Sequence, residues 1–354
     1  MLELVIEDVA FGGKGVARDE GKALFIPFTI DGERVTARIV REKKKFAEAE
    51  LIDVVGPSPH RVAPECPYFG RCGGCSYQHI SYGHQLELKA GQVEQVMRRI
   101  GLLAEPPVRP IIPSPLPYAY RNRITVHAED NVVGFYRRNV HKLMDIERCP
   151  IAAPEVNNAL AQLRAGRVRD GHYTLRAHSG PRVFAQTNNA VADALAGFIA
   201  GCFAGEEKLL IDAFCGAGFF SKRLAPQFER VIGIDWDRFA IAAAQENAAA
   251  SETYVAGDVT VELRSVLQQS DLKSTALIVD PPATGLSPEM RRAILDAPPR
   301  TMIYVSCNPP TLARDIAELQ RRFSILSVTP CEMFPQTAEI EVVAHLLRPD
   351  DSAG

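Results

Sequence analysis

The feature that most constrains this chain is a change of pattern near residue 205. From there onward, apolar runs of strand length alternate with helical segments, as in KLLIDAF, RVIGID, TYVAGD, ALIVDPP and RTMIYVSCN. Strands that alternate with helices predict a parallel sheet with helices on both faces. Two last apolar runs, FSILSVTP and EIEVVAHLL, predict a closing hairpin of strands. The C-terminal part is therefore predicted to be a Rossmann-like α/β domain.

The residues before this point have a different texture. Residues 1 to about 53 alternate short β-type runs, five in all, with glycine turns, which is typical of a small β-barrel. The proline-rich segment GPSPHRVAPECP marks a linker, residues 81–100 have apolar positions at helical spacing, and strand-type runs return between about 118 and 188. We therefore predict an OB-like barrel, a β-rich central domain and an α/β domain, over residues 1–55, 56–180 and 181–354.

Charge is distributed unevenly along the chain, although the formal net charge is only −3. Residues 1–182 hold 26 Lys and Arg against 21 Asp and Glu, whereas residues 183–354 hold 14 against 22. A mildly basic front half suits a module that grips a polyanion, and ordinary solvated surface charge explains the same numbers.

The expected location is the cytoplasm. No apolar run reaches the ~18 residues that a membrane span needs. The N-terminus carries Glu3, Glu7 and Asp8 rather than a basic stretch, which is unlike a secretory signal. We expect no membrane association and a monomer.

A glycine turn lies between the first strand and the first helix of the α/β domain. In IDAFCGAGFF this turn is Gly216-Ala217-Gly218, which lets the backbone approach a ligand at the sheet edge. The next strands end in Asp235, in Asp258 and in Asp280. A carboxylate such as Asp235 can accept hydrogen bonds from both ribose hydroxyls of an adenosine. Because Ser221 stands where a dinucleotide turn has its third glycine, S-adenosylmethionine is the preferred cofactor.

The apolar run MIYVS leads into Cys307, which is followed by Asn308-Pro309-Pro310 and a helical segment. The N-terminus of a helix helps to lower the pKa of a nearby thiol. A cysteine after an apolar strand is, however, more often an inert core residue. From its position alone, both a nucleophile and a core residue remain open.

Four cysteines in the front half have a spacing typical of a metal site. Cys66, Cys72 and Cys75 form C-x5-C-x2-C, and Cys149 follows later. In an intracellular chain this spacing favours metal binding over disulfides. Four thiolates suit either Zn²⁺ or an iron–sulfur cluster. The spacing differs from the C-x3-C-x2-C of radical enzymes that use S-adenosylmethionine.

The longer motifs resemble a known family. YVSCNPPTLARD, with DPPATG, FPQTAEIEVV, FAQTN and IDAFCGAGFF, resembles the RNA uracil-5-methyltransferases over essentially the whole chain. The N-terminal barrel is similar to a TRAM domain, and the subgroup most similar is that of the iron–sulfur bacterial enzymes that methylate 23S ribosomal RNA. This resemblance implies methyl transfer from S-adenosylmethionine to carbon 5 of a uridine, in 23S ribosomal RNA rather than in transfer RNA.

The resemblance also implies roles for individual residues. Cys307 would add to carbon 6 of uracil, and Glu341 would remove the proton from carbon 5. The four cysteines would hold a [4Fe–4S] cluster rather than zinc. The cofactor would be lined by Gln186, Phe214, Gly216, Phe219, Asp235, Asp258 and Asp280, with Asp280 between cofactor and target base.

Three positions depart from the family pattern. Ala283 stands where D-P-P-R-x-G has its arginine, Glu339 stands where a histidine is frequent, and Phe219 stands where asparagine is frequent. These differences leave the reaction class intact, but they put contacts to the target base and one cofactor contact in question.

Two other functions remain as alternatives, namely RNA cytosine-5 methylation and a non-catalytic RNA-binding assembly factor. The presence of both Cys307 and Glu341 argues against the second. RNA is the expected partner, and basic and aromatic residues of the front domains are candidate contacts. These are Arg38, Arg41, Lys43, Lys44, Lys45, Phe46, Tyr118, Tyr120, Arg121, Arg123, Phe135, Tyr136, Arg137 and Arg138.

Overall fold

The computed structural model describes residues 1–138, 140–177 and 186–349. The chain divides into two compact units, which we call the N-terminal unit and the α/β unit. The first comprises Met1–Gln92, Ser114–Ser179 and Phe334–Glu339, and the second comprises Val93–Pro113, Gly180–Met333 and Ile340–Gly354. The three-domain division of the sequence stays a prediction. Within the described ranges, none of the helices combines the length and apolarity that a membrane span requires.

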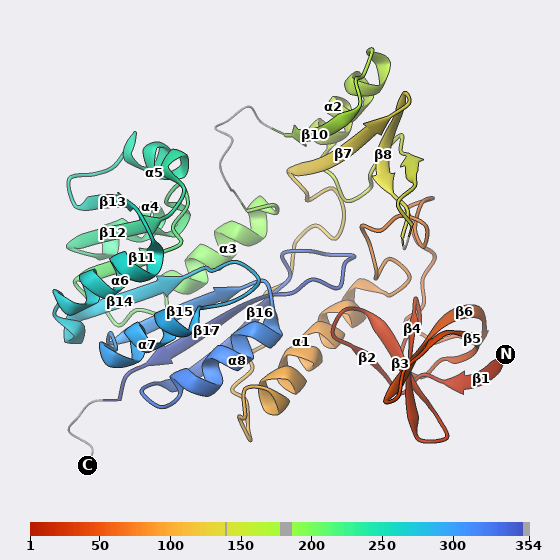
Figure 1. The fold of residues 1–354 in the computed structure, drawn as a ribbon, viewed down its shortest axis with the longest axis horizontal. Helices are drawn as coiled ribbons and strands as arrows, with labels where there is room; N and C mark the ends of the chain where they lie inside the picture. Colours follow the sequence, from red (N-terminus) through yellow and green to blue (C-terminus); the bar gives the residue numbers. More distant parts are fainter. Residues whose placement is uncertain (139, 178–185, 350–354) are drawn as a thin grey trace. The chain divides into compact units, whose positions relative to one another are not determined.

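The N-terminal unit begins with a six-stranded sheet in the order β1-β5-β6-β4-β3-β2 (Figure 1). Its core contains Leu4, Ile6, Leu24 and Ile26, because alternate residues of each strand point to the same face. The strands are β1 (Leu2–Val5), β2 (Asp8–Ala10), β3 (Lys14–Asp19), β4 (Lys22–Pro27), β5 (Arg34–Glu42) and β6 (Phe46–Gly56).

The structure has six strands here where the sequence predicted five. The run LELVIEDVA breaks in the middle because it changes pairing partner. The Ile6 amide donates to the Glu33 carbonyl, at 2.9 Å, whereas the next amide, of Glu7, donates to the Val16 carbonyl, at 2.8 Å. One apolar run therefore serves as two strands.

A buried carboxylate closes this sheet against the segment that follows it. Glu33 is 0 % exposed and accepts hydrogen bonds from Arg61 Nη2 at 2.8 Å, the Ile30 amide at 2.9 Å and the Ser58 amide at 3.3 Å. Burial raises the pKa of Glu33, but the hydrogen bonds from Arg61 and Ile30 outweigh it and hold this pKa below its usual range.

A second sheet of the N-terminal unit has the order β10-β7-β8-β9 and is antiparallel. One face packs on helix α2 through Ile124 and Val126 of the sheet and Val156 and Leu160 of the helix. Pro154 at the first turn of α2 fits a helix start, since that position needs no N–H donor. The elements are β7 (Arg123–Glu129), β8 (Val132–Tyr136), β9 (Leu143–Asp145), α2 (Pro154–Ala165) and β10 (Gly171–Arg176). The predicted helix at residues 81–100 is α1 (Tyr82–Arg99).

The α/β unit contains a seven-stranded sheet in the order β13-β12-β11-β14-β15-β17-β16. All neighbours are parallel except β17, which runs antiparallel to both β15 and β16. The predicted α/β alternation and the closing hairpin are thus confirmed. The strands are β11 (Leu209–Ala213), β12 (Arg230–Asp235), β13 (Glu252–Ala256), β14 (Thr275–Val279), β15 (Thr301–Ser306), β16 (Ser324–Cys331) and β17 (Glu341–Leu347).

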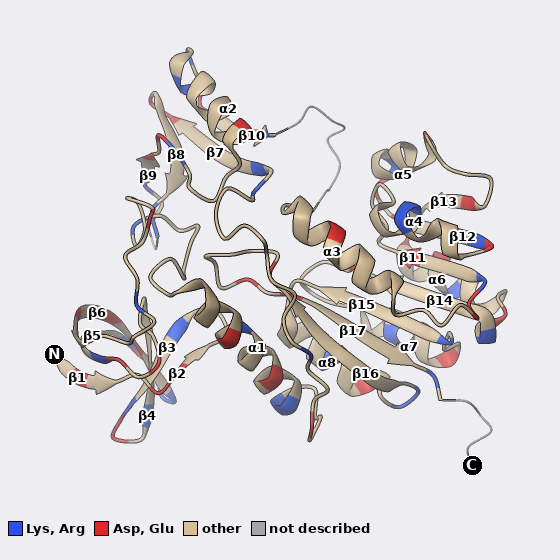
Figure 2. Cartoon of the chain, turned by 180° about the vertical axis from the view of Figure 1, so that it is seen from behind, with Lys and Arg blue, Asp and Glu red and all other residues tan. Residues whose placement is uncertain are grey.

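The central strands of this sheet are apolar and buried, as expected for strands covered on both faces. Every residue of β14 and β15 is buried. Figure 2 shows these strands mostly without charge, and it shows the charged residues mainly on helices, loops and strand ends. The helices are α3 (Asn189–Ala200), α4 (Phe219–Leu224), α5 (Arg238–Gln245), α6 (Val259–Gln268), α7 (Pro288–Asp296) and α8 (Pro309–Leu319), with the short 3-10 helices η1 (Ala225–Gln227) and η2 (Leu272–Ser274).

Candidate functional site

Most of the predicted cofactor residues follow the carboxyl ends of strands of the α/β sheet. Strands β11, β12 and β14 are parallel and in register, with Ala213 opposite both Ile234 and Val279. The residues that follow these strands therefore emerge together at their carboxyl ends. In open α/β sheets this edge is where ligands bind.

The glycine turn after β11 has backbone conformations that suit glycine. Gly216 has φ +54° and Gly218 has φ +81°, and Phe214 also has a positive φ, +67°. A Cβ on Gly218 would lie 2.9 Å from the Tyr254 hydroxyl oxygen. The turn thus leaves no room for a larger residue at Gly218, and the strained Phe214 is of the kind found at binding sites.

The carboxylate of Asp235 holds this turn in place. One oxygen accepts the Gly216 amide at 2.8 Å, and the other accepts the Asp237 amide at 2.9 Å. Asp235 is 7 % exposed at the end of β12. Each carboxylate oxygen has a second lone pair, so Asp235 can still accept hydrogen bonds from a ribose.

The other predicted cofactor residues differ in their surroundings. Asp258 is exposed and caps α6, accepting the Thr260 and Val261 amides at 2.9 and 3.0 Å. Phe219 begins α4, with the Arg223 guanidinium 4.0 Å from its ring centroid. Gln186 is 8 % exposed, whereas the first two residues of the FAQTN motif lie outside the described residues.

Two carboxyl groups at this edge have raised pKa values. Burial raises the pKa of Asp280 to about 7, and the charge of Asp212 contributes. Burial likewise raises the pKa of Asp212 to about 7, against hydrogen bonds donated by the hydroxyl and amide of Ser221. Asp212 is not among the residues predicted from the sequence. Its signal was an acidic residue inside the apolar run KLLIDAF.

The structure places Cys307 in the turn between β15 and α8. Among the described cysteines it is the exposed one, which excludes the reading as an inert core residue. The Ser306 hydroxyl closes the turn by accepting the Asn308 amide at 3.1 Å. Cys307 therefore precedes a helix N-terminus, where the dipole favours a thiolate.

Glu341 is the first residue of β17, directly beside the strand that leads to Cys307. In the β15–β17 register, Val305 lies opposite Val343 and Ser306 lies opposite Val342. One further step along this register sets Cys307 across from Glu341. Glu341 is 3 % exposed, which is unusual for a carboxylate at a strand end and argues against an ordinary surface position.

The loop after Asp280 is attached to the helix that follows Cys307. The Ala283 carbonyl accepts hydrogen bonds from Asn308 Nδ2 at 3.0 Å and from Thr311 Oγ1 at 3.1 Å. The Thr284 carbonyl accepts one from Arg314 Nη2 at 3.0 Å. At the position where the family motif has an arginine, the backbone thus contacts the Cys307 turn directly.

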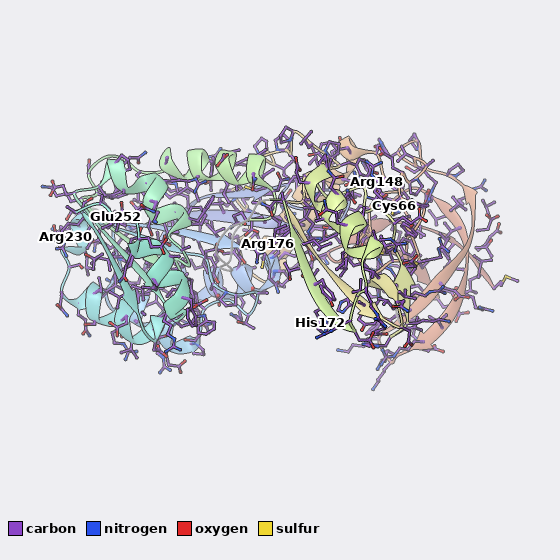
Figure 3. The ribbon with its side chains drawn as sticks, turned by 90° about the horizontal axis from the view of Figure 1, so that it is seen from above. Cys66, Arg148, His172, Arg176, Arg230 and Glu252 are labelled. Carbon is purple, nitrogen blue, oxygen red and sulfur yellow. The ribbon has the colours of Figure 1, made fainter. Side chains whose placement is uncertain are left out.

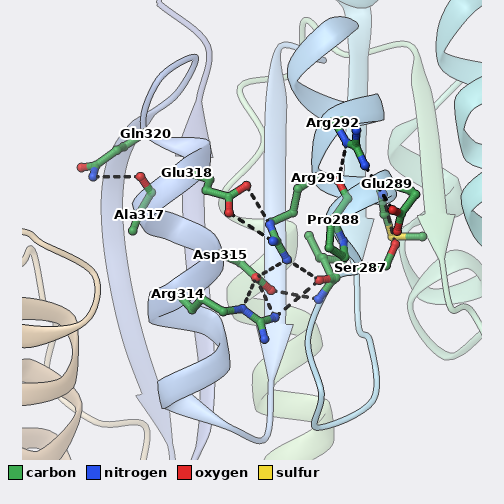
Figure 4. A network of polar contacts seen from close by, with 12 residues as sticks. Ser287, Pro288, Glu289, Arg291, Arg292, Arg314, Asp315, Ala317, Glu318 and Gln320 are labelled. Carbon is green, nitrogen blue, oxygen red and sulfur yellow. Dashed lines mark hydrogen bonds and ion pairs between the residues drawn. The ribbon is translucent and has the colours of Figure 1, made fainter.

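A buried carboxylate, that of Asp315 in α8, organises the surroundings of this loop (Figure 4). Asp315 is 0 % exposed and accepts the Leu286 amide at 2.9 Å and the Tyr304 hydroxyl at 2.7 Å. It also accepts hydrogen bonds from Arg291 Nη1 at 3.0 Å and Arg314 Nη2 at 2.8 Å. Asp315 therefore joins the loop, β15, α7 and α8, and it is not among the residues predicted from the sequence.

The four cysteines of the front half gather in the N-terminal unit. Burial raises the pKa of Cys75 to about 12 and that of Cys149 to about 11, and charges of other thiols in the group contribute to both. The Gly74 amide donates to Cys72 Sγ at 3.4 Å. Within residues 1–138, 140–177 and 186–349, however, no group of three or more His, Cys, Asp or Glu side chains is arranged to hold a metal ion.

Some predicted RNA contacts already have structural partners. Tyr120 is buried and donates its hydroxyl to the Pro335 carbonyl at 3.0 Å. Arg138 donates to the Cys75 carbonyl at 2.8 Å, and Arg38 pairs with Glu50 at 2.7 Å. These side chains stabilise the unit, and their contact with RNA stays a prediction.

Known proteins similar to this chain agree with these features. Residues 164–348 match the tRNA (uracil-5-)-methyltransferase family, and residues 1–52 match the TRAM domain. An uncharacterized RNA methyltransferase of Bdellovibrio bacteriovorus is 31 % identical, covering 98 % of this chain and 94 % of that protein. Another, of Gloeobacter violaceus, is 29 % identical over 97 % of this chain and 95 % of that protein.

A solved structure has the same fold. It is the tRNA (uracil-54, C5)-methyltransferase of Pyrococcus abyssi in complex with S-adenosyl-L-homocysteine, with a TM-score of 0.75 and 24 % identity. The match covers 98 % of this chain and 100 % of that one. The family match extends over more than half of the chain, and the relatives match nearly all of it. The chain therefore belongs to the tRNA (uracil-5-)-methyltransferase family and begins with a TRAM domain.

Proposed function

We propose that this protein transfers a methyl group from S-adenosylmethionine to carbon 5 of a uridine in 23S ribosomal RNA. The observation that carries the proposal is the β15–β17 register, which ends with Ser306 opposite Val342 and, extended by one residue, sets exposed Cys307 opposite buried Glu341. Family membership supports RNA methylation and uracil as the target.

The chemistry requires a nucleophile and a base at adjacent positions. S-adenosylmethionine, when bound, supplies an electrophilic methyl group. The Cys307 thiolate adds to carbon 6 of uracil, and the displaced electron pair makes carbon 5 nucleophilic, so that carbon 5 bonds to the methyl group and S-adenosylhomocysteine leaves. Glu341 then accepts the carbon 5 proton, the double bond re-forms, and the thiolate departs.

Asp280 is suited to bind the target base. Because burial and the charge of Asp212 raise its pKa, Asp280 holds a proton more readily than an ordinary carboxyl group. A protonated carboxyl donates a hydrogen bond to a carbonyl oxygen, such as those of uracil. In this proposal Asp235 accepts the ribose hydroxyls of the cofactor, and the remaining cofactor contacts come from Gln186, Phe214, Gly216, Phe219 and Asp258.

Adduct formation tests the two catalytic roles. With RNA that contains 5-fluorouridine, the protein should form a covalent complex that mass spectrometry locates at Cys307. Cys307→Ala should abolish the adduct, whereas Cys202→Ala, at a half-buried cysteine of another element, should retain it. A crosslink at another residue, or none, would contradict the mechanism.

The role of Glu341 as the catalytic base is tested with RNA that contains ordinary uridine. Glu341→Gln should accumulate a protein–RNA adduct, since the thiolate cannot leave until the carbon 5 proton is removed. The exposed neighbour Glu339→Gln is the matched control and should turn over without accumulating adduct. An absence of adduct with the Glu341 variant would assign proton removal to another group.

We further propose that the four cysteines hold a [4Fe–4S] cluster. The donor set consists of thiols alone, and backbone amides donate to Cys72 and Cys149, as is common around cluster sulfurs. The cluster would connect the segments carrying Cys66, Cys72, Cys75 and Cys149, a structural role. Purified protein should contain iron and sulfide and should absorb visible light. Cys75→Ser should lose the iron and sulfide together with this absorption. Stoichiometric zinc in place of iron would instead identify the four cysteines as a Zn²⁺ site.

The RNA species requires its own test. The solved Pyrococcus abyssi enzyme is named for transfer RNA, which makes transfer RNA the second candidate. Mapping 5-methyluridine in ribosomal and transfer RNA, with and without the gene, decides between them. Loss of the modification from 23S ribosomal RNA alone supports the proposal, and loss from transfer RNA alone contradicts it.

A further inference from the structure

The sheet β10-β7-β8-β9 has a polar face opposite the face that packs on α2. Residues two apart in an antiparallel strand lie on the same face. Ile124, Val126 and Ala128 of β7 belong to the core with α2, so their neighbours in β7 point away from it. We call the outer surface of these two strands the Arg–Thr–His face, and it consists of Arg123, Thr125, His127, His172, Thr174 and Arg176.

Across this face, like residues stand opposite each other. Arg123 is opposite Arg176, Thr125 is opposite Thr174, and His127 is opposite His172. The two threonine hydroxyls are 3.2 Å apart, and the two imidazole rings are 4.6 Å apart in an edge-to-face arrangement. His172 and Arg176 lie towards opposite ends of β10 (Figure 3).

The arginine pair is unfavourable for the sheet itself. Like charges directly opposite in a sheet are destabilising. Burial lowers the pKa of Arg123, and the charges of Arg176 and then Arg121 lower it further, in keeping with the register that sets Arg123 opposite Arg176. Basic segments are visible at this end of β10 in Figure 2. A polyanion bound at this end would relieve the repulsion.

At the histidine end of the face, aromatic side chains lie next to one another. The His127 ring centroid lies 4.4 Å from that of Tyr136, which in turn lies 4.1 Å from that of His141. The Tyr136 hydroxyl donates to Glu129 at 2.6 Å, and this hydrogen bond fixes the ring. Flat rings of this kind stack on unpaired bases.

The arginine pair and the rings of this face suit the two chemical parts of RNA, its phosphates and its bases. His127 lies four residue steps along β7 from Arg123, a distance of roughly 13 Å that accommodates a short run of nucleotides. We propose that the Arg–Thr–His face binds a single-stranded segment of RNA, with phosphates at the arginine pair and bases on the rings. The identification of this segment as part of the substrate rests on the proposed function.

The test uses the full chain and a short fluorescein-labelled oligouridine. The double variant Arg123→Ala with Arg176→Ala should bind this RNA more weakly. Its slope of log K against log salt should be smaller in magnitude by about 1.4, because each phosphate contact on a single strand contributes about 0.7. His127→Ala with His172→Ala should weaken binding roughly tenfold, with little change in slope, because it removes stacking rather than charge.

Controls separate this site from general electrostatics and from misfolding. Arg230→Ala with Arg322→Ala removes the same charge from exposed positions of the α/β unit and should leave both affinity and slope unchanged. Arg123→Lys with Arg176→Lys should retain the slope. The alanine double variant should remain folded at the temperature of the binding assay, which thermal unfolding followed by circular dichroism checks.

Two outcomes overturn the proposal. One is an alanine double variant that binds oligouridine with the wild-type affinity and slope, or that loses no more than the Arg230/Arg322 control. The other is binding of polyglutamate, but not of oligouridine, to this face, which would indicate that its partner is an acidic protein. The adduct at Cys307 is measured separately at saturating RNA, so failure of the proposed catalysis is distinguishable from failure of this surface.

Discussion

Replacing Asp315 by Asn tests whether one buried carboxylate holds the Cys307 turn and the loop after Asp280 together. One oxygen of Asp315 accepts from Arg291 and Arg314, and the other accepts from the Leu286 amide and the Tyr304 hydroxyl. An asparagine of the same size keeps one acceptor and turns the other into a donor. One of the two sets of donors then faces an N–H₂ group.

The expected loss in the free energy of unfolding follows from the hydrogen bonds that asparagine cannot accept. Two hydrogen bonds to a charged acceptor contribute about 1.5 to 3 kcal/mol each when both partners are buried. Arg314 is 45 % exposed, so its share is reduced by solvent, and Arg291 keeps its pairing with Glu318. We therefore expect Asp315→Asn to destabilise the α/β unit by about 3 kcal/mol, at the low end for a broken buried ion pair.

Urea unfolding followed by circular dichroism at 222 nm is a suitable assay, because it reports the loss of the helices, and α7 and α8 carry Arg291 and Asp315. Glu318→Gln is the matched control. Glu318 pairs with the same Arg291 but is 40 % exposed, so it should cost less than about 1 kcal/mol. Equal midpoints for the two variants, at an equal slope, would refute the assignment of Asp315 as the centre of the network.

Three other predictions follow from the site and the N-terminal sheet. Because the pKa of Glu33 is held below its unfolded value, its stabilisation is present above the unfolded pKa and is lost as the pH falls through the folded pKa; Glu33→Gln should therefore weaken the acid dependence of unfolding measured by circular dichroism. Gly218→Ala should weaken S-adenosylmethionine binding in calorimetry, since its φ is +81° and the new Cβ would meet the Tyr254 hydroxyl at 2.9 Å; an unchanged affinity would argue against a tight turn. Methyl transfer should decline as the pH rises through about 7, where Asp280 loses its proton, and Asp280→Asn should remove that limb of the pH profile, whereas persistence of the limb would assign it to another group.

Local pattern was enough to predict the α/β sheet, because its strands are short apolar runs and each is followed by a helix or a turn. It was not enough where pairing partners decide the outcome. The break between Ile6 and Glu7 follows from a change of partner strand, which no local pattern contains.

The candidate site was predictable only in part for the same reason. The motif around Cys307 predicted this residue as the nucleophile, but the burial of Glu341 depends on the neighbours of β17. The pairing of Arg123 with Arg176 depends on the register of two strands separated by the whole of α2. Asp315 looked like one acidic residue on a helix, and its importance depends on the loop before α7, β15 and α7, which all pack against it.

The reversed direction of β17 has a chemical consequence. In a sheet whose strands all ran the same way, the residues at the ligand edge would all follow strands, and Glu341 would lie at the opposite rim. Because β17 runs antiparallel to β15, its first residue, Glu341, lies at the edge where β15 ends and Cys307 follows. A single inverted strand thus sets two residues that are 34 positions apart in the chain, Cys307 and Glu341, one step beyond the last pair of the register, without a long loop between them.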